Sequence, residues 1–170
     1  MAELRCRGCG HRIDDAAPTP FSCPQREAQP GLDHVLVRHL YDDEVARWPT
    51  FHGAANPFVL YRGRWRASAI AHDRGLSDGA LVELIEELDE KVARTWGCGF
   101  RVTPLQRAPE SLAAALGCGP DALWLKDETG NVSGSHKARH LFGVLIHLEI
   151  AARVLGYEER PPLAIASCGN

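Results

Sequence analysis

A glycine-containing loop that ends in a lysine is the part of the sequence best suited to covalent chemistry. It runs GNVSGSHK over residues 130–137, and Gly134 allows backbone angles that other residues resist. Ser135 is a good N-cap, which would place Lys137 in the first turn of a helix. There the positive end of the helix dipole, together with loss of solvent in a pocket, favours the neutral amine. A neutral lysine amine can form a Schiff base with an aldehyde, so Lys137 is a candidate for that chemistry.

Two other motifs fit this segment poorly. A nucleotide-binding P-loop needs G-x-x-x-x-G-K-[ST], but five residues after Gly130 the sequence has Ser135 where that motif requires glycine. His136 and His140 are four residues apart, but the zinc motif H-E-x-x-H needs a glutamate where Lys137 stands. Taken by spacing alone, Lys137 has one remaining alternative, an exposed lysine at the start of a helix.

A second polar turn follows an apolar segment at the far end of the sequence. LAIAS, residues 163–167, is almost wholly apolar, which is typical of a strand buried in a parallel sheet. It leads directly into Cys168, Gly169 and Asn170, and the asparagine side chain offers both a donor and an acceptor to a ligand. Alone this is also an ordinary turn. Because this turn comes one helix and one strand after Lys137, the pair of loops is a more specific sign of a ligand site than either loop alone.

The segments around these loops predict a βαβ unit of an α/β fold. ALWLK at 122–126 predicts a strand, about 135–155 a long helix ended by Gly156, and 163–167 a second strand. A right-handed crossover would bring both loops to one edge of a parallel sheet. Ligands bind at that edge in open α/β sheets.

Earlier segments are expected to pack rather than to react. A helix is predicted at 77–96, capped by Ser77 or Asp78, because leucines, Ile85 and Val92 recur every three or four residues. A shorter helix is predicted at 110–116. The remaining expectations are a short strand or helical turn at 32–40, a loop from Trp48 to Tyr61, and a solvated strand or loop face for Arg62, Arg64 and Arg66.

The two loops together resemble the fold type II pyridoxal-phosphate (PLP) enzymes, which include threonine synthase, threonine and serine dehydratases, serine racemase and cysteine synthase. The resemblance rests on WLKDETGNVSGSHKAR, on IASCGN, and on Thr103-Pro104-Leu105, which is similar to the T-P-L that opens the catalytic core of that family. It implies a tryptophan synthase β-like fold and PLP as cofactor. It also implies that Lys137 forms the Schiff base and that Asn170 bonds the 3′-oxygen of PLP, with Ser135 and Gly169 beside the cofactor.

The resemblance implies a lyase that acts on a hydroxy or phospho-hydroxy amino acid. Lys137 would hold the cofactor and shuttle the α-proton of the substrate. Elimination of water from threonine or serine and conversion of O-phosphohomoserine to threonine both stay open. A glycine-rich phosphate loop has no counterpart in these 170 residues, so we expect the N-terminal part of a longer enzyme, inactive alone. The alternative is a catalytically inactive PLP-fold fragment or a regulatory or binding module.

The N-terminus resembles the cysteine-bearing segment, L-x-C-x-x-C-G then C-P-x-C, with which threonine synthase relatives often start. LRCRGCG at 4–10 and CPQR at 23–26 are similar, but Arg26 stands at the fourth cysteine position. His11 or His34 could replace it. Because structural zinc needs a closed tetrahedral ligand set, we favour a degenerate ribbon without metal. The weak candidate ligands are Cys6, Cys9 and Cys23.

Composition and the motifs together predict three parts: a degenerate zinc-ribbon-like segment over 1–30, a helical or irregular region over 31–100, and the start of a PLP-binding α/β core over 101–170. A net charge of −3 argues against a nucleic-acid partner, and no apolar run is long enough for a membrane span. Six cysteines without a signal-peptide pattern predict thiols or metal ligands in the cytoplasm. We expect an amino-acid substrate and, at full length, a homo-oligomer.

Overall fold

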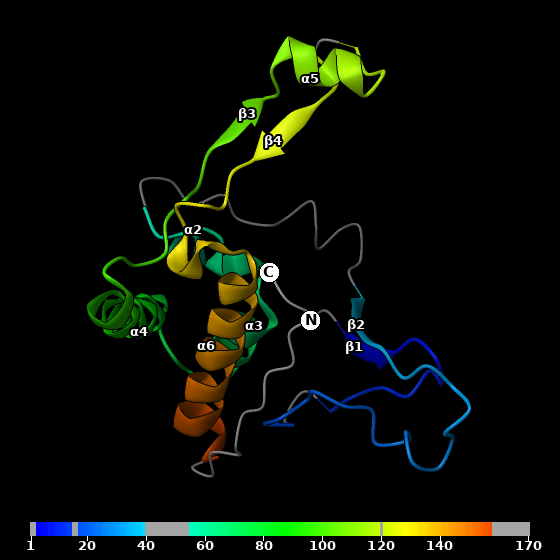
Figure 1. The fold of residues 1–170 in the computed structure, drawn as a ribbon. Helices are drawn as coiled ribbons and strands as arrows, with labels where there is room; N and C mark the ends of the chain where they lie inside the picture. Colours follow the sequence, from blue (N-terminus) through cyan, green and yellow to red (C-terminus); the bar gives the residue numbers. More distant parts are fainter. Residues whose placement is uncertain (1–2, 15–16, 40–54, 120, 158–170) are drawn as a thin grey trace.

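The computed structural model describes residues 3–14, 17–39, 55–119 and 121–157 (Figure 1). Helices α2, α3, α4 and α6 gather in one body, the β3–β4 pair with α5 projects from it, and the β1–β2 pair lies on another side. In chain order the elements, with η for a short 3₁₀ helix, are β1 (Glu3–Cys6), β2 (Leu36–His39), α2 (Pro57–Leu60), η1 (Arg62–Arg64), α3 (Arg66–Asp73), α4 (Asp78–Trp96), β3 (Leu105–Arg107), α5 (Glu110–Ala115), β4 (Trp124–Lys126), η2 (Val132–Gly134) and α6 (Lys137–Leu155).

Helix α4 confirms the helix predicted at 77–96. The Ser77 side chain accepts a hydrogen bond from the backbone N–H of Ala80 at 3.2 Å, so it is the N-cap. Gly97 ends the helix in the left-handed conformation, with φ of 88°. The apolar residues that recur every three or four positions form its buried face, which consists of Leu81, Leu84, Ile85 and Leu88.

Helix α6 begins two residues later than the predicted start near Ser135 and ends as predicted before Gly156. Ser133 and Gly134 both have positive φ, at 58° and 60°, and Ser135 is extended. A right-handed helix cannot pass through such residues, so the first helical residue is Lys137.

Aromatic side chains fill the core between the helices. The rings of Phe58, Phe100 and Phe142 have centroids 4.5–5.0 Å apart, and Trp65 lies 4.7 Å from Phe58 in an edge-to-face contact. Such pairs add about 0.5–1.5 kcal/mol each beyond the area that they bury. These rings join α2, α3 and α6 to the segment after α4, and the buried leucines of α4 complete the core.

The predicted loop from Trp48 to Tyr61 is wrong over its described end, because Pro57–Leu60 is helix α2. The residues that suggested a loop start this helix instead. The Asn56 side chain accepts from the backbone N–H of Phe58 at 2.8 Å, and Pro57 occupies the first turn, where no N–H is needed. Residues 48–54 lie outside the described part of the chain.

The arginine cluster was predicted on a strand or loop, and this is also wrong. Arg62 and Arg64 lie in η1, and Arg66 opens α3. Arg62 is 11% exposed and forms two hydrogen bonds, of 2.7 and 2.6 Å, with the carboxylate of Asp78 at the start of α4. The tight ion pair lowers the pKa of Asp78 below its usual value. One arginine of the cluster therefore joins two helices rather than facing solvent.

The two described strand pairs are both antiparallel. β3 pairs with β4, with Leu105 opposite Lys126, and α5 lies between them in the chain. The predicted strand at 122–126 and helix at 110–116 are thus present in shorter form. The predicted strand at 163–167, with Gly169 and Asn170, lies outside the described residues, so the parallel βαβ unit stays a prediction.

The N-terminal part extends further than the predicted boundary at residue 30. β1 pairs with β2, with Glu3 opposite His39 and Cys6 opposite Leu36, so this unit runs to His39 at least. Within the described ranges, no helix combines the length and the apolar character needed to cross a membrane.

Gly99 gives the first test of this packing. A Cβ at this position would lie 2.6 Å from Oδ2 of Asp89, whose carboxylate accepts hydrogen bonds from Phe100 N–H at 2.7 Å and from Asn56 at 2.9 Å. We expect Gly99→Ala to lower the free energy of unfolding by about 1–3 kcal/mol, measured by urea denaturation. The control Gly79→Ala, in the first turn of α4 with nothing closer than 4.0 Å, should leave stability equal or raise it by up to about 1 kcal/mol. Equal losses in both variants would contradict this packing.

Candidate functional site

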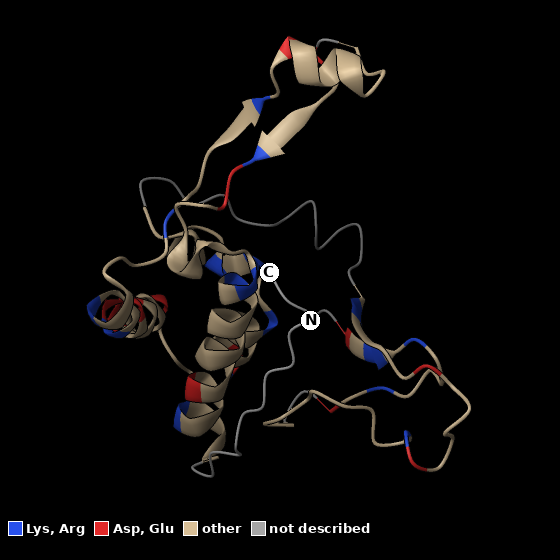
Figure 2. Ribbon diagram, in the orientation of Figure 1, with Lys and Arg blue, Asp and Glu red and all other residues tan. Residues whose placement is uncertain are grey.

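An ion pair joins the segments that carry the resemblance described above. Glu128, just after β4, accepts from Thr103 Oγ1 at 2.6 Å and from Arg139 Nε at 2.8 Å. Arg139, in the first turn of α6, also donates to the Arg101 carbonyl at 2.9 Å, and Lys126 donates to the Thr103 carbonyl. Figure 2 shows acidic residues directly after β4 and basic residues at the start of α6. This network therefore sets the position of the N-terminal end of α6.

The network favours the ionised form of Glu128. Its side chain is 16% exposed and that of Arg139 is 22% exposed. Burial by itself opposes ionisation of Glu128. The hydrogen bonds from Arg139 and Thr103 and the charge of Arg139 outweigh it, so the net pKa of Glu128 is lowered. Charge-assisted bonds of this kind are stronger than neutral ones.

Lys137 lies two residues before Arg139 and is half-buried. The Ser135 hydroxyl accepts a hydrogen bond from the backbone N–H of Lys137 at 3.2 Å, so Ser135 caps the helix start although it lies one residue before the cap position. The Asn131 side chain donates to the Ser135 carbonyl at 3.0 Å, and both residues are buried. The backbone on either side of Lys137 is thus fixed, by Ser135 before it and Arg139 after it.

The loop before Lys137 has an unusual backbone. Ser133 has φ of 58° without being glycine, and Gly134 follows at 60°. The left-handed conformation costs a non-glycine residue about 1–2 kcal/mol. Such strain clusters at functional sites, where surrounding contacts enforce it. Here the enforcing contacts include the bond from Asn131 to Ser135.

A hollow of about 430 Å³ lies beside Lys137, with Ser133 and Ser135 also in its wall. The rest of its lining is apolar and consists of Val92, Phe100, Val132, Ala138, Leu141, Phe142 and Leu145. A larger hollow of about 490 Å³, lined by Lys126, Glu128 and Arg139 among others, does not include Lys137. Both hollows combine a lysine with apolar walls, Lys126 in the larger hollow and Lys137 in the smaller one.

The residues that line the smaller hollow fit an aromatic aldehyde cofactor. The apolar wall suits a ring, two serine hydroxyls can donate to oxygen atoms, and Lys137 supplies the amine. Asn131 Oδ1 is buried and has no hydrogen-bond partner in the described part of the chain. A buried amide oxygen without a partner is costly, but Asn131 is not among the residues that line either hollow.

Of the residues predicted to bind a cofactor, Lys137 and Ser135 lie together in the described structure, whereas Gly169 and Asn170 fall outside it. Sequence reasoning assigned no role to Glu128 or Arg139. Both were in the segment that carries the resemblance, and their opposite charges were the available signal. A pairing between residues on either side of a loop could not be read from spacing.

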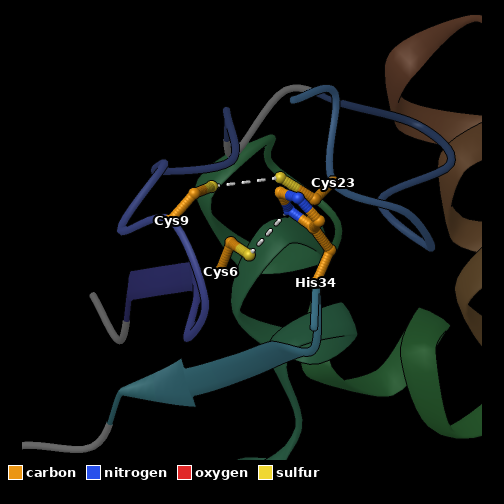
Figure 3. Close-up of side chains that lie close together, drawn as sticks. All are labelled: Cys6, Cys9, Cys23 and His34. Carbon is orange, nitrogen blue, oxygen red and sulfur yellow. Dashed lines mark hydrogen bonds between the residues drawn. The ribbon is translucent and has the colours of Figure 1, made fainter. Parts of the chain in front are cut away.

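A second cluster lies in the N-terminal unit (Figure 3). Cys6, Cys9, Cys23 and His34 point toward one another, and their four ligand atoms all lie within 4.8 Å of each other. Cys9 Sγ is 3.5 Å from Cys23 Sγ, and Cys6 Sγ is 3.5 Å from His34 Nδ1. Cys6 and Cys23 are buried, at 0% and 3% exposure. The weak candidate ligands Cys6, Cys9 and Cys23 are thus brought together, with His34 as a fourth group.

The surroundings of this cluster shift three pKa values. Hydrogen bonds, chiefly from the backbone of Cys9, lower the pKa of Cys6 to about 6 although burial opposes this. Burial raises the pKa of Cys23 to about 11. A hydrogen bond to the Gln29 carbonyl raises the pKa of His34. The cluster therefore favours one thiolate, at Cys6.

Comparison with known proteins adds no relative. No protein-family model, no curated protein and no solved structure matches this chain.

The network at Glu128 gives a prediction on pH. Because the folded pKa of Glu128 is lowered, its contribution to stability is present above its ordinary pKa of 4.5 and is lost as pH falls through the lowered value. We expect Glu128→Gln to lower the free energy of unfolding by about 2 kcal/mol at neutral pH. The difference in unfolding free energy between this variant and the wild type should narrow below about pH 4.5.

Urea denaturation across that pH range measures this effect. The matched control is Glu90→Gln, because Glu90 pairs with Arg94 at 3.3 Å on the exposed face of α4. That change should lower the free energy of unfolding by less than about 0.5 kcal/mol. A constant gap between wild type and Glu128→Gln at all pH values would show that ionisation of Glu128 does not stabilise the fold.

Proposed function

We propose that this chain is the N-terminal part of a PLP-dependent lyase of fold type II, with Lys137 as the lysine that holds the cofactor. One observation carries the proposal. The T-P-L segment at Thr103, the segment after β4 at Glu128 and the segment after Lys137 at Arg139 meet in one hydrogen-bond network. These three segments carry the resemblance to the catalytic core of the PLP enzymes, and they lie side by side next to the loop that ends in Lys137.

Each residue of the loop has a definable task in this proposal. The Lys137 amine would hold the cofactor covalently and, once released, take the proton from the α-carbon of the substrate. Phe100, Val132 and Phe142, which line the same hollow as Lys137, would shield a bound cofactor ring from water. Ser135 would bond the cofactor. PLP, when bound, supplies an electron sink for negative charge at the substrate α-carbon.

The substrate class in this proposal is a hydroxy or phospho-hydroxy amino acid, and loss of water or of phosphate from the substrate is the expected chemistry. We also propose the cytoplasm as its location. The cysteines within the described ranges are free thiols, which suits a reducing compartment. At full length, the proposed lyase is a homo-oligomer.

Labelling of lysines tests the proposal directly, because the sequence contains only three, at positions 91, 126 and 137. PLP would be added to the protein, the adduct reduced with borohydride, and the labelled peptides quantified by mass spectrometry. We expect Lys137 to be labelled at lower PLP concentrations than the other two, by a factor of about 10 or more. The reason is that Lys137 shares its hollow with the Ser135 hydroxyl and apolar side chains that can hold the cofactor ring, whereas Lys91 lies on the exposed face of α4.

Two variants serve as controls. Lys137→Arg should remove the preferred label, whereas Lys91→Arg should leave it unchanged, because Lys91 is an exposed residue paired with Glu87 on α4. Similar labelling of all three lysines in the wild type would refute the proposal. It would favour a regulatory or binding module without catalytic chemistry.

A further inference from the structure

The distances in the cysteine–histidine cluster are close to those of a tetrahedral metal site. With Zn–S bonds of about 2.3 Å and Zn–N bonds of about 2.0 Å, a regular tetrahedron has edges of about 3.8 Å between two sulfurs and about 3.5 Å between sulfur and nitrogen. The Cys9–Cys23 and Cys6–His34 separations are both 3.5 Å. The remaining pairs are within 4.8 Å. The Cys9–Cys23 pair would open by about 0.3 Å and the remaining pairs would close by at most about 1.3 Å to surround one ion.

The histidine is held in the form that a metal requires. Its Nε2 lies 2.9 Å from the Gln29 carbonyl, and a carbonyl only accepts, so Nε2 carries the hydrogen. In the neutral ring Nδ1 then has a free lone pair, and Nδ1 is the atom that faces Cys6. Metal-binding histidines are commonly oriented by such a bond from the second ring nitrogen to a carbonyl. This bond is an observation independent of the sulfur positions.

Backbone contacts bring the Cys6–Cys9 turn against the residues on either side of His34. The N–H of Arg7 donates to the Val35 carbonyl at 2.8 Å, and that of Gly10 to the Cys6 carbonyl at 2.9 Å. A Cβ at Gly8 would lie 2.4 Å from the backbone oxygen of Asp33, so only glycine allows this approach. Elements far apart in sequence are thus fixed at the spacing that one ion needs.

We propose that Cys6, Cys9, Cys23 and His34 bind one Zn²⁺ ion in a closed structural site. His34 takes the place that a fourth cysteine would hold, while Arg26, which stands there in the sequence, is an exposed residue. This replaces the expectation of a degenerate ribbon without metal. Three sulfurs and one nitrogen leave no open position for a substrate, so the ion acts on folding rather than on catalysis. The proposal does not depend on the PLP assignment.

Binding of zinc at this site would also affect the packing against the helical body, because the segment between Cys9 and Cys23 contacts α6. His147 of α6 is buried, at 9% exposure, and its Nε2 donates to the Pro18 carbonyl at 2.9 Å. The Phe21 ring meets the His147 ring edge-on at 5.8 Å. Because Cys23 follows Phe21 by two residues, fixing Cys23 also fixes this contact.

Metal analysis of the whole protein, purified under reducing conditions, tests the site. We expect about one zinc per chain, and His34→Ala should weaken zinc affinity more than about 100-fold, beyond the 10–100-fold typical of losing an outer partner. His11→Ala is the matched control, because His11 was the other candidate ligand and its contact with the cluster is a backbone bond, to Cys6. It should keep the metal.

A second pair of changes separates ligation from misfolding. His34→Cys should keep one metal, and cobalt in this variant should give the stronger thiolate-to-metal absorption of four sulfurs. Gly8→Ala should weaken zinc binding about 10-fold or more without removing a ligand, whereas Gly31→Ala, with nothing within 4 Å of its Cβ, should not.

Three results would overturn the proposal. The first is reduced wild-type protein that neither contains nor takes up zinc. The second is equal loss of zinc in His11→Ala and His34→Ala. The third is iron, or a Cys9–Cys23 disulfide that persists under reducing conditions, in place of zinc. A disulfide would need the two sulfurs to move from 3.5 Å to about 2.05 Å.

Discussion

The ion pair between Glu128 and Arg139 is the contact on which the arrangement around Lys137 depends. It ties the end of β4 to the first turn of α6, across a loop that contains Ser133 at positive φ. Thr103 adds the segment before β3 to the same carboxylate. Burying a carboxylate is costly unless it is paired and hydrogen-bonded, and here both conditions are met. The bonds from Asn131 to the Ser135 carbonyl and from Arg101 to the Gly130 carbonyl hold the loop from within, and the Glu128–Arg139 pair ties the end of β4 directly to α6.

The N-terminal unit, residues 3–39, is stabilised by other contacts than the helical body. It has few buried apolar side chains, and its short β1–β2 pair is marginal without support. The cysteine–histidine cluster supplies that support in our proposal, as metals often do in small units that lack a sufficient core. The helical body instead relies on the rings of Phe58, Phe100 and Phe142. His147 joins the two, and burial lowers its pKa, which keeps the ring neutral where it donates to Pro18.

Elements with a strong apolar period could be predicted from the sequence, and α4 and the end of α6 are the clearest cases. The failures have a common physical cause. Asn56 and Pro57 are residues of loops and also of helix starts, and only packing of Phe58 into the core decides between the two. His34 could be named as one of two replacements for a missing cysteine, but its selection depends on the β1–β2 register. Lys137 and Ser135 were identified from local spacing, whereas Glu128 and Arg139 act through a contact that spacing does not show.

We propose that the Glu128–Arg139 pair positions Lys137 to hold PLP. Titration of PLP into the protein, followed by the visible absorption of the bound cofactor, measures this most directly when wild type, Lys137→Ala and Glu128→Gln are compared. We expect saturable absorption in the wild type, none in Lys137→Ala, and an apparent affinity about 10-fold weaker in Glu128→Gln while that variant is still folded. Equal absorption in the wild type and Lys137→Ala would contradict it.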